Sequence, residues 1–156
     1  MSCKVRVDYK ELVEFQAKLN KLQQKEIRAF CERVSKLVAA QLLAIVIPTT
    51  PVGVYPKESG KVGGTLKRGW TGGKETNGFT YAATLPVSLG GLEYTIVVKN
   101  PVHYASYVEF GHRTRGGKGF VEGKFFMRKA QIKVEAMLPK LIEQQMKTFL
   151  KSQGII

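Results

Sequence analysis

Apolar residues recur at helical spacing through the first third of the chain. From Leu12 to Leu42 most of them are three or four residues apart, so at about 100° per residue they lie along one broad helical stripe. The stripe consists of Leu12, Phe15, Leu19, Leu22, Ile27, Phe30, Val34, Leu37, Val38 and Leu42. The polar run at residues 23–26 shifts the phase of the stripe, which allows a bend or a break there.

Local signals give the limits of this helix. Asp8 is followed three residues later by Glu11, a spacing that resembles a capping box. Pro48 disfavours helical conformation in the preceding residue, Ile47. The pattern therefore predicts a long N-terminal helix over about residues 8–47. At 1.5 Å per residue it would be about 55–60 Å long, more than the diameter of a small domain, so part of it is expected to project.

A loop and then a β region follow. Residues 48–64 contain four glycines and three prolines, a composition that predicts a loop. Two segments, 78–87 and 92–99, are rich in aromatic and β-branched residues and predict strands, with the Ser-Leu-Gly-Gly sequence between them as a hairpin connection. Residues 65–70 fit either a short third strand or a helical turn. We therefore expect a β region over residues 65–100.

A short helix and a basic loop are predicted over residues 101–123. Residues 104–110 fit a short helix with one apolar face, and Gly111 is a suitable stop for it. The Gly-rich segment from His112 to Gly119 is interpreted as a flexible basic extension.

The last part of the chain has a second long apolar stripe. It predicts a C-terminal helix over residues 124–153, in which Pro139 should kink the helix or divide it in two and Gly154 should end it. The order of helix, strands and helix predicts an α+β fold, with a small antiparallel sheet that contains a β-hairpin and the C-terminal helix packed on that sheet. The length of 156 residues fits a single domain, 1–156.

Charge is the compositional feature that adds most to this picture. The chain carries 25 Lys and Arg against 12 Asp and Glu, a net charge of +13 at pH 7. A field of this strength attracts nucleic acid, an anionic membrane or an acidic protein surface. Much of the excess lies in two loop-like stretches. Their basic residues include Lys57, Lys61, Lys67 and Arg68 in the first and Arg113, Arg115, Lys118 and Lys124 in the second.

Membrane insertion and disulfide bonding are not expected. The longest apolar run, residues 37–47, is interrupted by Gln41 and is far shorter than the roughly 20 residues that a membrane span needs. Cys3 and Cys31 form no C-x-x-C pair, and the favoured interpretation is that both thiols are reduced.

The candidate chemistry in the Gly-rich loop is weak. His112 lacks an evident oriented partner, and its nine-residue separation from His103 is not a metal-ligand spacing. Gly111 and Gly116 have the separation found in a P-loop, but the Gly-Lys-Ser/Thr ending is missing. We therefore predict that the chain is not an enzyme and has no catalytic, cofactor-binding or metal site.

Nucleic-acid binding remains as the alternative. The basic side chains of the second stretch could neutralise phosphates, although the chain has no helix-turn-helix, ribonucleoprotein or zinc-finger motif. Four aromatic residues could stack on bases, but packing against the sheet and the C-terminal helix is favoured for them. These are Tyr104, Tyr107, Phe110 and Phe120.

Two separated segments together resemble a known family. The first is Thr50-Pro51-Val52 with Gly64-Thr65-Leu66-Lys67-Arg68-Gly69-Trp70, and it resembles the "T-P-V … T-G-x-L-R-x-S-W" signature of bacteriophage tail-completion or head–tail joining proteins, also labelled minor capsid or neck proteins. The second is Tyr104-Ala105-Ser106-Tyr107-Val108-Glu109-Phe110-Gly111-His112 with Phe126-Met127-Arg128-Lys129-Ala130, and it is similar to the family's "Y-A-x-Y-V-E-x-G-T … F-M-R-x-A". Gly69 stands where the family has a small hydroxyl residue.

The resemblance implies structural roles for the motif residues. Thr65 and Leu66 would fix the entry into the sheet next to Trp70, and Tyr104, Tyr107 and Phe110 would pack before the stop at Gly111. Glu109 would accept hydrogen bonds from backbone N–H groups or from an Arg such as Arg128, because a half-buried carboxylate needs compensation. Phe126 and Ala130 would dock the C-terminal helix on the sheet.

The resemblance also implies a function without chemistry. The expected protein is a virion component at the head–tail junction or tail end, assembled in the host bacterial cytoplasm. It would form a homo-oligomeric ring, expected to be a hexamer, and would contact neighbouring connector and tail proteins and, non-specifically, the packaged DNA. No membrane partner and no cofactor are implied. The alternative function is a free basic nucleic-acid-binding protein.

Overall fold

The computed structural model describes residues 10–20, 22–74, 76–91 and 93–156. Its fold is α+β, as predicted, although two separate hairpins take the place of one small sheet. The elements are α1 (Lys10–Asn20), α2 (Gln24–Thr49), the 3-10 helix η1 (Lys57–Ser59), α3 (Thr65–Gly69), α4 (Gly78–Thr84), β1 (Val87–Gly90), β2 (Glu93–Ile96), α5 (Ala105–Phe110), β3 (Gly111–Arg113), β4 (Phe120–Glu122) and α6 (Phe126–Ser152).

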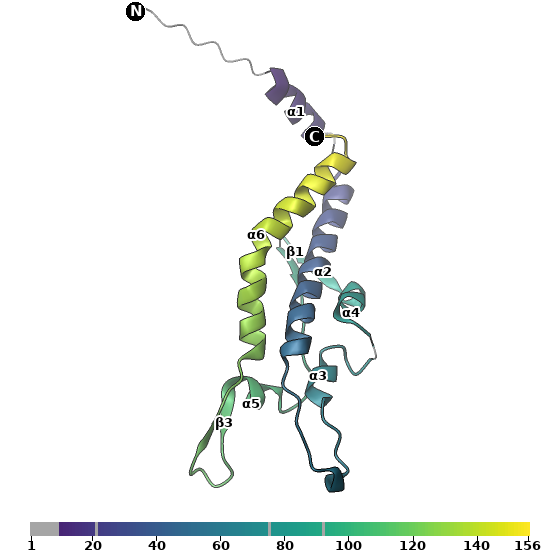
Figure 1. The fold of residues 1–156 in the computed structure, drawn as a ribbon. Helices are drawn as coiled ribbons and strands as arrows, with labels where there is room; N and C mark the ends of the chain where they lie inside the picture. The colour runs from purple at the N-terminus through teal and green to yellow at the C-terminus, as the bar shows by residue number, and fades with distance from the viewer. Residues whose placement is uncertain (1–9, 21, 75, 92) are drawn as a thin grey trace, which may run out of the picture.

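Two long helices form the axis of an elongated molecule. α2 and α6 lie side by side (Figure 1), and α4 and β2 also pack against α2. The core consists of Ala39, Ala40, Leu43, Val46, Leu66, Trp70, Ala82, Phe126 and Ala130. Ile96 and Val98 pack against this core, so the C-terminal helix packs on the β1–β2 side of the molecule as well as on α2.

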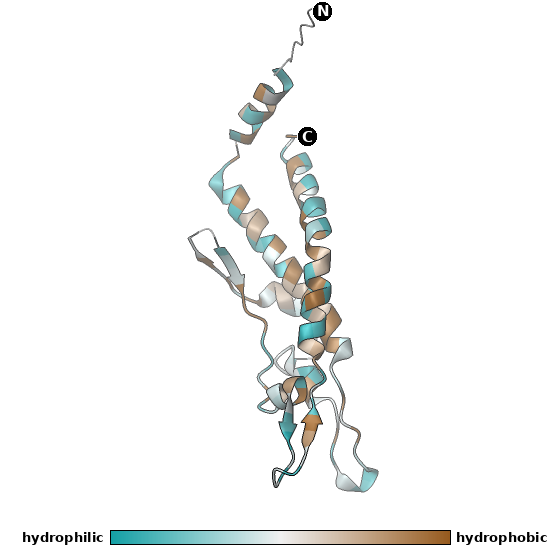
Figure 2. Ribbon diagram, turned by 90° about the vertical axis from the view of Figure 1, so that its left-hand side faces the viewer, coloured by the Kyte–Doolittle hydropathy of each residue, from teal (hydrophilic) through white to brown (hydrophobic). Residues whose placement is uncertain are grey.

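The two ends of the molecule differ. The C-terminus lies at one end, near α1 (Figure 1). The loop that carries η1 and the β3–β4 hairpin project from the opposite end in both views (Figures 1 and 2).

The N-terminal helix is interrupted where the phase of its apolar stripe shifts. α1 ends at Asn20 and α2 begins at Gln24, where the backbone N–H of Gln23 donates to the Glu26 carboxylate over 3.1 Å. A break was one of the two outcomes expected here, and it is confirmed. The proposed capping box includes Asp8, which lies outside the described residues.

α2 extends two residues beyond Ile47, near which its end was expected. The helix includes Pro48 and ends at Thr49. A proline has no N–H, so in the last turn it removes a single bond, normally made to the carbonyl of Ala44. The hydroxyl of Thr49 donates to the carbonyl of Ile45 over 2.8 Å and supports this final turn.

The predicted strand at residues 78–87 is wrong, because residues 78–84 form α4. The side chain of Asn77 accepts a hydrogen bond from the N–H of Thr80 over 2.8 Å, which caps the helix N-terminus. Gly78 and Ala82 are both buried and are four residues apart, so they lie on one face of α4 and allow it to approach α2 closely. Tertiary contact therefore overrides the β propensity of this aromatic segment.

Substitution of Gly78 by Ala should test this close approach. A Cβ atom at position 78 would lie 2.7 Å from the Cβ of Leu43, which is fully buried and cannot move aside. Overpacking costs about 1–3 kcal/mol, and the gain in helix propensity is at most about 1 kcal/mol, so we expect a net loss of about 1–2 kcal/mol in urea unfolding. Gly90→Ala is the control, since a Cβ there meets no atom within 4 Å. Equal stability of the two variants would contradict the packing.

The predicted β-hairpin is confirmed as β1–β2, but the residues that connect its strands differ from those predicted. β1 pairs antiparallel with β2 in a register that joins Val87 to Ile96 and Gly90 to Glu93. The Ser-Leu-Gly part of the predicted connection therefore belongs to β1, and the strand predicted to reach residue 99 ends at Ile96.

The basic extension is a second hairpin and not an irregular loop. β3 pairs with β4 in a register that joins Gly111 to Glu122 and Arg113 to Phe120. The turn is closed by the N–H of Thr114, which donates to the carbonyl of Gly119 over 2.9 Å. Gly116, with φ 96°, adopts the left-handed backbone that this tight turn requires. The glycines predicted a flexible segment, and the sequence carries no signal for the pairing of the two three-residue strands on either side of them.

The C-terminal helix is continuous and ends as predicted. α6 runs through Pro139 and bends about half way along (Figure 1), so the proline kinks the helix without dividing it. Gly154 has φ 65°, and the N–H of Ile155 donates to the carbonyl of Leu150 over 2.9 Å, the pattern of a Schellman motif. In the part of the chain that the model describes, no helix combines the length and apolar character needed to cross a membrane.

Candidate functional site: a buried junction of the two motifs

The first motif is closed by a buried chain of hydrogen bonds. The indole N–H of Trp70 donates to the hydroxyl of Thr50 over 2.7 Å, and this hydroxyl donates to the carbonyl of Val46 over 2.6 Å. Trp70 and Thr50 are only 4% and 3% exposed. These two hydrogen bonds connect the end of α3 to the C-terminal end of α2, and they give Thr50 of the "T-P-V" segment a structural role.

Asn100 fixes the other side of α3. Its amide nitrogen donates to the carbonyl of Leu66 over 2.7 Å, and its oxygen accepts from the N–H of Val102 over 3.2 Å. A Cβ atom at Gly69 would collide with the Asn100 oxygen, so this approach explains why a glycine stands in the motif. Leu66 is buried and Thr65 is exposed at the start of a helix, so the expectation that they lead into a sheet is wrong.

Glu109 connects the second motif to α6. Its carboxylate accepts one hydrogen bond from the backbone N–H of Met127 and one from that of Arg128, each 3.0 Å long, and its residue is only 7% exposed. The first N–H groups of a helix have no partner within the helix, and they carry the positive end of its dipole. Of the two kinds of partner expected for Glu109, backbone amides are confirmed.

The backbone of Glu109 supports the same connection. Its carbonyl accepts from the N–H of Phe125 over 3.1 Å, and the N–H of Lys124 donates to the carbonyl of Val108 over 2.9 Å. A Cβ atom at Gly123 would collide with the carbonyl oxygen of Glu109. Phe125 has φ 51°, an unusual conformation for a side chain of this size. The entry into α6 is therefore held by both the side chain and the main chain of Glu109.

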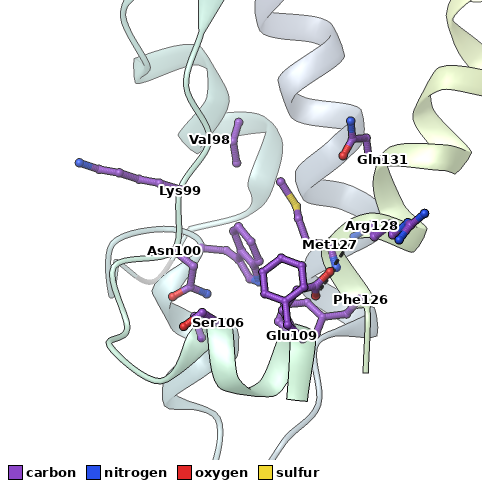
Figure 3. A pocket seen from close by; sticks show the side chains of 12 residues that line it. Val98, Lys99, Asn100, Ser106, Glu109, Phe126, Met127, Arg128 and Gln131 are labelled. Atoms are coloured by element: carbon purple, nitrogen blue, oxygen red, sulfur yellow. Dashed lines mark hydrogen bonds between the residues drawn. The ribbon is translucent and has the colours of Figure 1, made fainter. Parts of the chain in front are cut away.

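The two motifs meet at Phe126. Its ring packs edge-on against Trp70, with centroids 6.2 Å apart. An open groove of about 470 Å³ lies beside this pair and is bordered by Val98, Asn100 and Met127 (Figure 3). Within the described ranges, no buried side-chain nitrogen or oxygen lacks a hydrogen-bond partner. The polar groups of the junction are thus used to hold the fold.

The aromatic residues of the second motif have different environments. Tyr104 is half-buried and packs against the core, and Phe126 is buried. Tyr107 and Phe110, however, are 57% and 64% exposed, and Phe120 is 61% exposed. The expectation that these three would pack is wrong. Tyr107 and Phe110 lie on α5, a single short helix with only one face against the molecule, and Phe120 lies on β4, a strand whose three residues are all exposed.

The other motif and basic residues fall into three groups. Ala130 is buried in the core, whereas the Arg128 side chain is exposed and contributes its backbone N–H. Lys67 and Arg68 lie on α3 and not in a loop. The side chain of Arg68 donates to the carbonyl of Gly63 over 3.2 Å. The remaining basic residues are exposed, namely Lys57, Lys61, Arg113, Arg115, Lys118 and Lys124.

The groups that could support catalysis are dispersed. The described ranges contain no cluster of three or more His, Cys, Asp or Glu residues that could hold a metal ion. His112 is exposed and contacts the Tyr107 ring, with centroids 5.8 Å apart. The pKa of Glu143 is lowered by its hydrogen bond with Lys147 and by the charge of that side chain, but both residues are exposed on α6.

Sequence reasoning missed Asn100, Gly69 and Gly123 as parts of the junction. The Asn-Pro dipeptide at 100–101 is a turn signal, but the carbonyl of Leu66, to which the Asn100 side chain donates, lies 34 residues away. The glycines are explained by contacts with distant backbone and side chains.

The site is thus a buried, hydrogen-bonded junction at which two sequence motifs join the long helices of an α+β fold. The chain belongs to the HK97-gp10-like family, described as "Bacteriophage HK97-gp10, putative tail-component", whose model matches residues 13–111. The resemblance to bacteriophage tail proteins is thereby confirmed, and the family description supports a structural role as a tail component. No significant match was found among curated proteins or among solved structures.

Proposed function

We propose that the chain is a structural virion protein of a tailed bacteriophage that completes the tail, or joins the tail to the head, as a ring subunit around the DNA path. The observation that carries this proposal is that both motifs meet in one buried junction. There, the side chains of Thr50, Trp70 and Glu109 form hydrogen bonds that connect the helices of the fold. Membership of a family of phage tail components supports it.

A ring is consistent with the shape and charge of the subunit. The molecule is elongated and its two ends differ, which suits head-to-tail contacts that close by rotation; a hexamer is proposed. The net charge of +13 would help the ring to accommodate passing DNA. The family match gives no support to the alternative of a free nucleic-acid-binding protein.

Deletion of the gene in the phage that encodes the chain tests this proposal. We expect filled heads and tails that fail to join into infectious particles, and we expect the full-length chain to restore them. Cryo-electron microscopy of complemented virions should then show a ring of this fold at the neck or at the tail end. Absence of the chain from mature virions would overturn the proposal.

A further inference from the structure

The end of the molecule opposite the C-terminus carries two projecting elements. One is the loop of residues 51–64, here called the arm, and the other is the β3–β4 hairpin (Figures 1 and 2). Together with α5, which precedes β3, they form what we call the distal end. The arm and the hairpin are far apart in the sequence, yet both point away from the core.

The arm exposes apolar side chains that its own fold does not use. Val54 is 95% exposed and Val62 is 79% exposed. Val52 and Tyr55 are also exposed, and together with Val62 they line a pocket of about 350 Å³ at the root of the arm. A soluble surface rarely gathers large apolar side chains without a partner, so the arm has the character of a contact surface.

The remainder of the distal end shows the same property with aromatic residues. Tyr107, Phe110 and Phe120 are each more than half exposed, and the Phe120 ring lies against Gly111 at the hairpin base. Aromatic side chains are enriched in the centres of protein–protein interfaces, where they contribute much of the binding energy.

The exposed side chains of the distal end also carry a basic excess. The arm, α5 and the β3–β4 hairpin carry five Lys and Arg side chains against three acidic residues, Glu58, Glu109 and Glu122, and Glu109 is buried with its carboxylate bound to the start of α6. The five basic residues are Lys57, Lys61, Arg113, Arg115 and Lys118. Among the described residues, the salt bridge formed by side chains is Lys147 with Glu143 on α6, so none of the five cations is paired with a described carboxylate. Lys61 lies over the ring of Tyr55, 5.9 Å from its centroid.

We propose that the distal end is a docking surface for an acidic protein that presents apolar side chains, and that it is not a DNA contact. Phosphate binding would use the cations alone and would leave the valines and aromatic rings exposed. The distal end of a second copy is disfavoured as the occupant, because that surface carries the same basic excess. The proposal rests on the proposed function, since it assigns the surface to a neighbouring virion protein.

Binding to particles that lack the chain tests this inference. The probe is the purified particle from a gene-deleted lysate, and the measurement is co-sedimentation of the full-length chain over a salt series. The variant Val54→Ser with Phe110→Ser should weaken binding by about tenfold or more, and so should Arg113→Ala with Arg115→Ala and Lys118→Ala. All five positions are exposed, so the unfolding transitions should stay unchanged, which separates binding from folding.

Matched controls come from other surfaces of the same chain. Ile132→Ser with Val13→Ser removes apolar side chains of similar exposure, and Lys133→Ala with Lys140→Ala removes exposed cations of α6. Both double variants should bind like the natural chain.

The outcomes separate the two proposals. If the apolar variant binds normally, or if naked double-stranded DNA displaces the chain from the particles, the docking surface is overturned while the virion role stands. If the natural chain neither binds the particles nor occurs in virions, the proposed function fails as well.

Discussion

Trp70→Ala is expected to lower the free energy of unfolding by about 3–5 kcal/mol, the range for truncation of a large buried aromatic side chain. The ring of Trp70 packs edge-on against Phe126 and fills the space between α3 and the start of α6. The groove beside it is open, so water can enter the vacated space, and collapse of the site is not expected to recover the loss. Urea unfolding followed by circular dichroism measures the change.

Two variants separate the ring of Trp70 from its N–H group. Thr50→Val keeps the ring and the side-chain volume but removes the acceptor, so a buried indole N–H loses its partner; the expected cost is about 1–3 kcal/mol. Phe79→Ala truncates an exposed aromatic residue of α4 and should cost about 1 kcal/mol or less. If Trp70→Ala is no more harmful than Phe79→Ala, the junction does not hold the fold together.

The long helices were predictable because their signal is local and repeated. Each of their signals depends only on residues close together in one element. These signals are the apolar stripe of the N-terminal third, the phase shift at residues 23–26 and the glycine at position 154. The segment 78–84 was misread for the opposite reason. Its aromatic and β-branched residues favour a strand, while the helix depends on the contact of Gly78 with Leu43, 35 positions earlier in the chain.

The same distinction applies to the junction. The need of Glu109 for compensating donors could be predicted, as either backbone N–H groups or an Arg, because a half-buried carboxylate requires compensation. The structure shows that the donors are backbone N–H groups. The identity of those donors, and the role of Asn100, follow from the close approach of distant segments. The exposure of Tyr107 and Phe110 also could not be predicted from the local sequence pattern. An apolar face on a short helix does not show whether that face packs against the core or remains exposed for a partner.

Glu109→Ala is the substitution expected to loosen α6 from the rest of the molecule. It removes both acceptors of the first-turn amides of Met127 and Arg128 and the negative charge that complements the helix N-terminus. Hydrogen bonds to charged groups contribute about 1.5–3 kcal/mol each, and the two bonds share one carboxylate, so we expect a loss of about 2–4 kcal/mol. The amides of Met127 and Arg128 should also exchange hydrogen faster than those in the middle of α6.

Glu109→Gln distinguishes the charge and the acceptors from the volume of the side chain. Glutamine keeps the size but has one acceptor oxygen, and its NH₂ group would face the second backbone N–H. One amide therefore stays paired at most, and we expect a loss of about 1–3 kcal/mol with faster exchange at Met127 or Arg128. Glu135→Ala, on an exposed part of α6, should leave both amides unchanged. Unchanged exchange in Glu109→Gln would mean that the entry into α6 is held by the main-chain bonds of Lys124 and Phe125 alone.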